Sequence, residues 1–418
     1  MDTRNREIAV TGIGVLSPYG SGKELLWEAL NQGKSVFNRL AGIKTKPVLS
    51  KTGGQVPDFK LNTRTSEVVR ANRYCQFTYT AGDMAIRDSG LNIRQLDPYR
   101  LSVVFGTNCA HPSIERYSDA LKIRTSMYVN PNVAPFLISK KIRAKGILST
   151  ISSGEHSSAS ALSLACSLLR WGKCDQVLVG GTDVLARSNF LHYSSLYELS
   201  PTGERNDWGE KCTPYDRKRN GTTVSEGSAF VVLEDKQSAR NRGAHIYCDI
   251  LGVGSAYSPD FTTHDFTSGH IEHSMRECIS ETGASPSGID LVYGAANGGK
   301  KMDKAELKAI KTVFRANGNA PKLSSIKSYI GEIQGAFGIF NLIAAINAFE
   351  NGVILPIRGF SSPSFFYRDL NYVTSTQPAD RVNTILCNAI SYTGRSVSFI
   401  VGRAERSKPV NGKEVCVA

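Results

Sequence analysis

The chain has 418 residues, of which 41% are hydrophobic and 21% charged, so it is long enough for one large globular domain or two closely packed ones. Its formal net charge is +13, but the basic residues are scattered, which favours a solvated surface or an acidic protein partner over nucleic acid. The nine cysteines are odd in number and show no CxxC spacing, which argues against a disulfide framework and a zinc site.

Predicted elements recur in the same order in two stretches of the chain. Each stretch begins with a β-branched strand that ends in glycines, continues with a helix that ends in Ser-Gly or Thr-Gly, and then reaches a second apolar strand. These elements lie at residues 7–14, 76–89 and 101–106 in the first stretch, and at 246–254, 270–282 and 289–294 in the second.

Two further helices, at residues 155–171 and 335–351, are rich in small and apolar side chains. Each is followed by an apolar run, at 176–181 and at 353–356 respectively. Helices of this composition belong between two sheets rather than on the surface. We therefore predict an α/β fold with five layers, α/β/α/β/α, made of two similar halves. The expected division is a first half at residues 1–245, a second half at 246–408 and a tail at 409–418.

Several segments resemble the β-ketoacyl synthases of the thiolase superfamily. In chain order they are VTGIGVLSPYGSG near the start, GKCDQVLVGGTD, PYDRKRNGTTVSEGSAFVVLED at 214–235, MDKAELKAIKTVF at 302–314, SIKSYIGEIQGAFG at 325–338 and NAISYTG at 388–394. The resemblance covers nearly the whole chain and implies a thiolase-like fold. The early glycines fit neither a dinucleotide fingerprint nor a phosphate loop, because Ser17 and Glu24 occupy required positions. We therefore expect no cofactor.

The resemblance implies a nucleophilic cysteine at the N-terminus of a buried helix, where backbone N–H groups and the helix dipole lower the thiol pKa. Counting back without a gap from Gly180 and Gly181 places that cysteine at position 155, which is glutamate. Cys166 lies eleven residues further, about 16 Å along a helix, so it cannot substitute.

The resemblance also implies two histidines in the second half, which donate to the thioester carbonyl of the extender unit. Their expected positions are Ala295 and Glu332. Independently of any alignment, His273 is the last histidine of the chain, so both are missing. Lys327 matches a lysine of the family motif, but alone it supplies neither a nucleophile nor the histidine donors.

Two interpretations of Glu155 remain open. It is either a charge favoured by the helix dipole, or it fills the vacated thiol position and binds the nearby backbone donors. His156 follows it, but one residue along a helix turns the side chain by about 100°, so we expect a packed or capping histidine. Glu332 is either a solvated charge at a turn or, as we expect, a buried carboxylate bonded to Lys327. The nearby histidines 264, 270 and 273 lack further ligands, so we predict no metal site.

Loss of the three chemical positions within an intact scaffold is typical of chain length factors, the ketosynthase-like β subunits of type II polyketide synthases. That resemblance implies a non-catalytic subunit that forms a heterodimer with a ketosynthase α subunit. It also implies transient binding of an acyl carrier protein and a growing aromatic or polyene polyketide chain in the partner's tunnel. Chain length factors usually carry glutamine where Glu155 stands. The alternative is a decarboxylase that uses Glu155 to make starter units from malonyl carrier protein.

The resemblance places the length-setting gate near the subunit interface, after the strand at 101–106. The candidate gate residues are Pro112, Ile114, Glu115, Arg116, Asp119 and Phe136. No signal-peptide pattern and no apolar run of about 18 residues occurs, so we expect a cytoplasmic protein without membrane or nucleic-acid partners.

Overall fold

A computed structural model describes the parts of the chain that form the fold. The described residues are 6–46, 48–108, 130–196, 199–200, 211–259, 267–314 and 320–405. Among the helices in these parts, none is long and apolar enough to cross a membrane.

The first half builds one side of a large mixed sheet, with the strand order β6-β5-β7-β8-β1. β5 is parallel to its neighbours β6 and β7, whereas β8 runs antiparallel to β7 and β1. The strands are β1 (Ile8–Ser17), β5 (Leu101–Gly106), β6 (Leu148–Ile151), β7 (Gln176–Asp183) and β8 (Gly227–Asp235). Most of their residues are buried on both faces, as expected for strands covered by helices on both sides.

The second half repeats this arrangement, with the strand order β11-β10-β15-β16-β9 and β13 (Asn371–Tyr372) added at the outer edge. Its strands are β9 (Cys248–Tyr257), β10 (Leu291–Tyr293), β11 (Lys322–Ser324), β15 (Thr384–Ile390) and β16 (Arg395–Arg403). The two halves join where β1 and β9 pair antiparallel over three residues, from Ile8 opposite Ile250 to Val10 opposite Cys248. The predicted pair of similar halves is confirmed.

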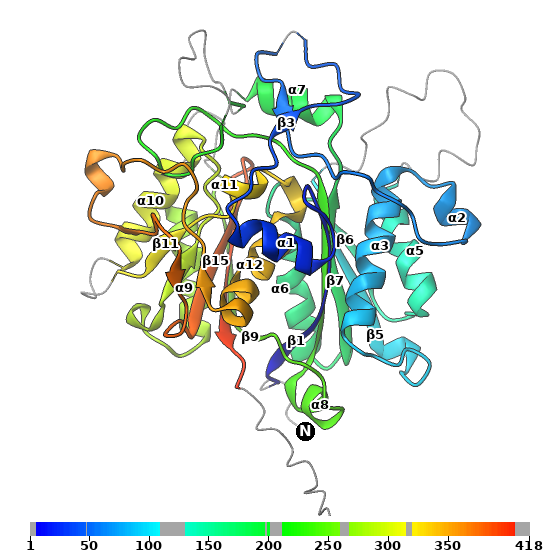
Figure 1. Cartoon of the computed structure of the whole chain (residues 1–418). Helices are drawn as coiled ribbons and strands as arrows, with labels where there is room; N and C mark the ends of the chain where they lie inside the picture. Colours follow the sequence, from blue (N-terminus) through cyan, green and yellow to red (C-terminus); the bar gives the residue numbers. More distant parts are fainter. Residues whose placement is uncertain are drawn as a thin grey trace, which may run out of the picture.

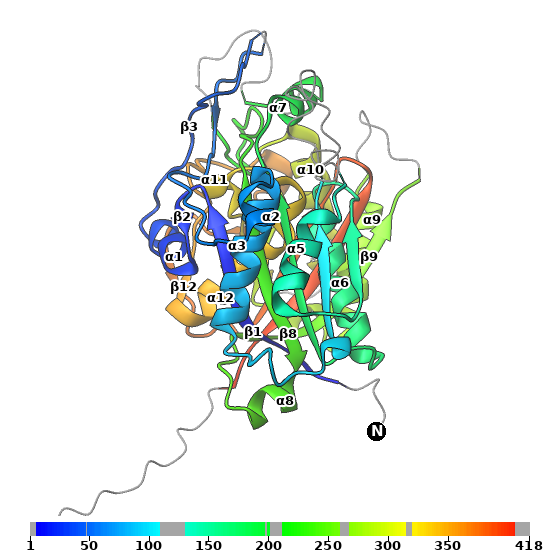
Figure 2. The ribbon, with the colours of Figure 1, turned by 90° about the vertical axis from the view of Figure 1, so that its right-hand side faces the viewer.

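Helices complete the five layers. α6 (Ser157–Arg170) and α12 (Phe337–Asn351) contact each other and strands of both halves, so they form the central layer (Figure 1). α3 (Arg73–Asp88) and α5 (Val133–Ile142) pack together on the outer face of the first half, which Figure 2 turns toward the viewer. α9 (Gly269–Glu281) and α10 (Lys300–Phe314) lie on the outer face of the second half. The predicted α/β/α/β/α fold is confirmed.

Shorter elements connect these layers. The helices are α1 (Lys23–Asn31), α2 (Ser66–Val69), α7 (Arg187–Ser195), α8 (Lys236–Asn241) and α11 (Lys327–Ile330). The 3-10 turns are η2 (Pro98–Arg100), η5 (Pro286–Gly288), η7 (Gln334–Ala336) and η8 (Phe365–Tyr367). The remaining strands are β2 (Gly20–Ser21), β3 (Asn38–Arg39), β4 (Thr52–Gly53), β12 (Val353–Ile354) and β14 (Gln377–Pro378).

Glycines at matching points of the two halves let a helix lie directly on a strand. A Cβ at Gly12 would stand 2.3 Å from the carbonyl oxygen of Ala85 in α3, and a Cβ at Gly252 would stand 2.4 Å from that of Cys278 in α9. Both distances are too short for any side chain. These glycines therefore allow a helix to pack closely on a strand.

One part of the predicted repeat is wrong. The run at 353–356 does not occupy the place that 176–181 occupies in the first half, because among the described strands β12 pairs only with β14, in a separate two-stranded ribbon. Gly352, at a left-handed φ of 66°, ends α12 and turns the chain away from the sheet. The counterpart of β7 is β15, which begins about thirty residues later.

Candidate functional site

Glu155 lies in the short connection between β6 and α6. The connection is tight: Gly154 has a left-handed φ of 105°, and a Cβ there would stand 2.1 Å from the hydroxyl of Ser391. Only glycine fits this close approach between the two halves. α6 itself begins at Ser157, two residues later than the sequence predicts.

The Glu155 side chain is buried and fully engaged by groups from other elements. Its carboxylate accepts hydrogen bonds from the hydroxyl of Tyr193 at 2.7 Å, the hydroxyl of Ser391 at 2.6 Å and the backbone N–H of Tyr392 at 3.2 Å. The side-chain amide of Asn108 lies 3.4 Å away. The carboxylate is thus held by α7 and by the turn after β15, rather than by the first N–H groups of α6.

Glu332 and Lys327 form a fully buried ion pair, with 2.6 Å between the carboxylate and the ammonium nitrogen. Glu332 also accepts hydrogen bonds from the side chain of Asn297 at 3.0 Å and the backbone N–H of Gln334 at 3.1 Å. Burial raises the pKa of Glu332, Lys327 opposes that rise and the charge of Glu155 adds to it. The ammonium of Lys327 also lies 3.9 Å from the ring centre of Phe337, a favourable contact for a buried cation.

A chain of hydrogen bonds connects the Glu155 and Glu332 positions. The side chain of Asn297 donates both to Glu332 and, at 2.8 Å, to the hydroxyl of Tyr392, whose backbone N–H bonds Glu155. Ala295 begins the loop that contains Asn297, and its N–H donates to Glu306 at 2.8 Å. The structure therefore connects Glu155, Lys327 and Glu332 through hydrogen bonds, whereas Ala295 lies two residues before the linking Asn297 and bonds to Glu306 instead.

His156 is buried and lies apart from this cluster's hydrogen bonds. Its Nε2 atom is 3.2 Å from the hydroxyl of Ser153. Burial, together with the positive charge of Arg395 and the proximity of His270, lowers the pKa of His156 to about 3. The imidazole is thus neutral at physiological pH, and it packs at the start of α6.

Two buried cysteines belong to segments that contribute to the site or lead away from it. Cys212 donates to the carbonyl of Asn297 at 3.1 Å, and burial raises its pKa to about 12. Burial likewise raises the pKa of Cys166, in α6, to about 12. A thiol with so high a pKa stays protonated at neutral pH, so neither cysteine supplies a thiolate.

Sequence reasoning missed the residues that hold the two carboxylates, namely Tyr193, Asn297, Ser391 and Tyr392. Two of them belong to the segment NAISYTG, so its resemblance to the family was an available signal. Nothing in the sequence around Tyr193 distinguishes it from a core aromatic residue.

The predicted gate residues fall in two places. Pro112, Ile114, Glu115, Arg116 and Asp119 lie outside the described residues. Phe136 lies on α5, where it is 48% exposed. Within the described residues, no group of three or more histidine, cysteine or acidic side chains is arranged to hold a metal ion.

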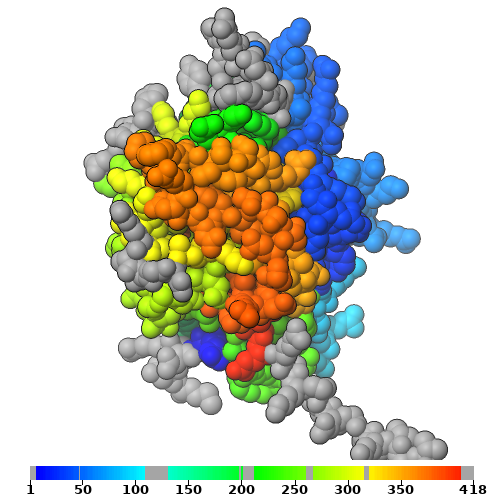
Figure 3. Space-filling model, turned by 60° about the vertical axis from the view of Figure 1, so that its left-hand side comes forward, coloured from blue at the N-terminus to red at the C-terminus, as the bar shows by residue number. Residues whose placement is uncertain are grey.

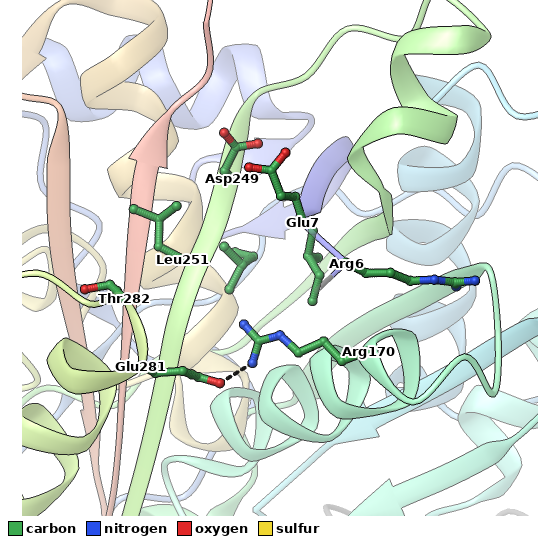
Figure 4. A pocket seen from close by; sticks show the side chains of 9 residues that line it. Arg6, Glu7, Arg170, Asp249, Leu251, Glu281 and Thr282 are labelled. Carbon is green, nitrogen blue, oxygen red and sulfur yellow. Dashed lines mark hydrogen bonds and ion pairs between the residues drawn. The ribbon is translucent and has the colours of Figure 1, made fainter. Parts of the chain in front are cut away.

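A separate cleft of about 320 Å³ opens at the other end of α6, where β1 meets β9. Figure 4 shows Arg170 reaching across it to Glu281, while Glu7 and Asp249 lie at its upper end. Asp249 also pairs with Lys236, so most of these charges are already compensated. Because Arg170 ends α6, the cleft is one helix length, about 20 Å, from Glu155.

Comparison with known families identifies the family to which this fold belongs. The family described as Beta-ketoacyl synthase, N-terminal domain, matches residues 5–239, more than half of the chain, and the corresponding C-terminal domain matches residues 247–361. The chain belongs to the beta-ketoacyl synthase family.

Individual relatives agree with this assignment. The chain is 28% identical to the tetracenomycin polyketide synthase ketoacyl synthase alpha subunit of Streptomyces glaucescens, over 97% of this chain and all of that protein. Its fold matches the ishigamide ketosynthase/chain length factor with a TM-score of 0.85 and 24% identity, over 96% of this chain and 100% of that one. It also matches one chain in the structure of a type II PKS acyl-carrier protein in complex with its ketosynthase, with a TM-score of 0.84, 23% identity and the same coverage.

Proposed function

We propose that this family member is the catalytically silent chain length factor of a type II polyketide synthase. It pairs with a ketosynthase that carries the cysteine and both histidines, and it shapes the tunnel that limits the polyketide chain. The observation that carries the proposal is the carboxylate of Glu155, which accepts three close hydrogen bonds at the position where we expect the nucleophile of an active family member. A carboxylate held in this way cannot form the thioester that condensation requires.

The cluster also lacks the donors that the chemistry requires. Ala295 has no side-chain donor, and Glu332 presents a carboxylate where the family's second histidine would stand. Decarboxylation of a malonyl thioester develops negative charge on the carbonyl oxygen, which a neighbouring carboxylate opposes. The site therefore favours a silent subunit over a starter-unit decarboxylase.

An open sheet edge supports the partner role. Among the described strands, β6 pairs only with β5, and all four residues of β6 are partly exposed. Beside it, Ile147 is 39% exposed and Phe136 of α5 is 48% exposed. An unpaired edge flanked by apolar side chains is suited to pairing with another chain. Because β6 leads directly to Glu155, a ketosynthase bound there would lie close to the site.

Reconstitution tests the proposal. We expect the purified chain, incubated with malonyl and acyl carrier protein, to gain no acyl mass and to release no CO2. Together with a ketosynthase α subunit it should co-purify and support condensation. Glu155→Gln is the matched control, because it restores the usual residue of chain length factors and should preserve pairing. A stable acyl adduct on the isolated chain, or CO2 release that depends on Glu155, would contradict a silent role.

The gate is tested in the same reconstituted pair. Shortening a side chain that closes the tunnel should admit further two-carbon units, each about 2.5 Å long in an extended chain. Ile114→Ala, Glu115→Ala, Arg116→Ala and Phe136→Ala are compared with the wild-type pair by mass spectrometry of the products. Unchanged product length in all four, at normal yield, would place the gate elsewhere.

A further inference from the structure

The outer face of α10 carries a line of lysines. Lys300, Lys304 and Lys308 are exposed and four residues apart, so each lies one helical turn beyond the last. The opposite face of the helix, with Met302, Leu307 and other apolar residues, is buried in the core. Among the ion pairs between described residues, none includes these three lysines.

Two aromatic rings stand at the end of this line. Phe365 and Phe366, in η8, are 67% and 75% exposed, the highest values among the large apolar side chains of the described residues. They are anchored to α10, because Lys311 donates to the carbonyl of Phe366 at 2.9 Å and pairs with Asp369 at 2.8 Å. Figure 3 shows the orange segment that contains η8 spread over the face turned forward, beside the yellow segment that contains α10.

The turn that presents these rings is held firmly. The hydroxyl of Tyr372 donates to the carbonyl of Tyr367 at 3.0 Å, and the Tyr367 N–H donates to Ser364. The guanidinium of Arg368 lies 4.5 Å from the ring centre of Phe365, which adds a further cation to the patch. An apolar ridge is thus fixed beside lysines that form no ion pair with another described residue. We call it the α10–η8 surface, comprising Lys300, Lys304, Lys308, Phe365, Phe366 and Arg368.

We propose that the α10–η8 surface binds an acidic helix of the acyl carrier protein, an inference that rests on the proposed function. Like charges one turn apart on a helix repel each other, and carboxylates at the same spacing on a partner helix would relieve that repulsion. Apolar side chains of the partner helix would cover the two rings. Exposed aromatic side chains beside cations are typical of the central contacts of protein interfaces.

The geometry of the rings favours a protein over a single-stranded nucleic acid. Phe365 and Phe366 meet edge to face, at an interplanar angle of 87° with ring centres 5.6 Å apart. Successive bases stack on flat, parallel aromatic faces, which this pair does not present. An edge-to-face pair instead offers a ridge on which aliphatic side chains pack.

The test measures binding of the holo-acyl carrier protein used in the reconstitution to the ketosynthase pair, by fluorescence anisotropy at low and moderate salt. We expect Lys304→Glu combined with Lys308→Glu to weaken binding by about tenfold, and to reduce its salt dependence. Phe365→Ser combined with Phe366→Ser should weaken binding without changing the salt dependence. Circular dichroism and co-purification with the ketosynthase check that each variant folds and pairs.

Matched controls separate a local surface from the general positive field. Arg94→Glu combined with Lys173→Glu changes the net charge by the same amount in the first half, at exposed residues, and Trp171→Ser removes an exposed aromatic ring. Neither control should change binding by more than about twofold. Equal weakening by the charge control, unaltered binding of the α10 variant, or competition by a single-stranded oligonucleotide at the same surface would each overturn the proposal.

Failure of the proposed function has a different signature. If no ketosynthase pairs with the chain, the proposed function is wrong, and binding of the acyl carrier protein is then measured on the isolated chain. If pairing and condensation are normal while the α10–η8 variants bind the carrier as the wild type does, only the docking surface is wrong.

Discussion

Replacing Lys327 with methionine should strongly destabilise the fold. Lys327 and Glu332 are both fully buried, and the 2.6 Å contact between them compensates two charges at once. Methionine fills a similar volume but leaves the Glu332 carboxylate with only the donors of Asn297 and Gln334. Removal of one partner of a buried ion pair typically costs about 3–5 kcal/mol of the free energy of unfolding.

The loss should depend on pH in a definite direction. Burial already raises the pKa of Glu332 above its ordinary value of 4.5, and Lys327 opposes that rise. Without Lys327 the pKa of the folded state rises further. A carboxyl group whose pKa is raised on folding stabilises the fold below the pKa of the unfolded chain, and this contribution is lost as pH rises through the folded pKa. The Lys327→Met variant should therefore lose more stability at pH 8 than at pH 5.

Urea unfolding followed by tryptophan fluorescence and circular dichroism measures the effect at both pH values. The control is the double variant Lys327→Met and Glu332→Gln, which removes both charges and keeps an acceptor for the neighbouring donors. We expect it to recover much of the loss, as coupled partners do in a double-mutant cycle. A loss below about 1 kcal/mol in Lys327→Met, or an equal loss at pH 5 and pH 8, would refute the reasoning.

Three further predictions concern other parts of the fold. The pKa of His156 is about 3 in the folded protein, below that of the unfolded chain, so its contribution to the free energy of unfolding should fall as pH drops from 6.5, by about 5 kcal/mol at most. His156→Gln should therefore flatten the dependence of the unfolding free energy on acid pH, and an equal dependence in variant and wild type would contradict this. Gly14→Ala would put a Cβ 1.9 Å from the carbonyl oxygen of Ala81, so it should lower the free energy of unfolding, measured in urea, by about 3 kcal/mol or more. Gly269→Ala is the control, because its Cβ would lie in open space and should leave the stability nearly unchanged. Glu155→Cys, paired with a ketosynthase whose own cysteine is replaced by alanine, should make no polyketide, because Ala295 and Glu332 supply no imidazole; detectable chain extension by mass spectrometry would disprove this.

Local patterns in the sequence were sufficient to predict the layered fold. The glycines at 12 and 252, each within a β-branched strand, marked the start of two similar halves. Periodicity reports which face of an element is buried, so the small-residue helices could be placed between sheets. The absence of histidine after His273 needed no structure at all.

Tertiary structure decided which groups surround Glu155. Ser391 lies 236 residues from Glu155 in the chain, and their contact depends on how closely the two halves approach at Gly154. The run at 353–356 has the composition of a core strand, yet the turn at Gly352 takes it out of the main sheet. Composition and spacing describe each segment's own burial, whereas the partner of a buried carboxylate is selected by contacts between segments far apart in sequence.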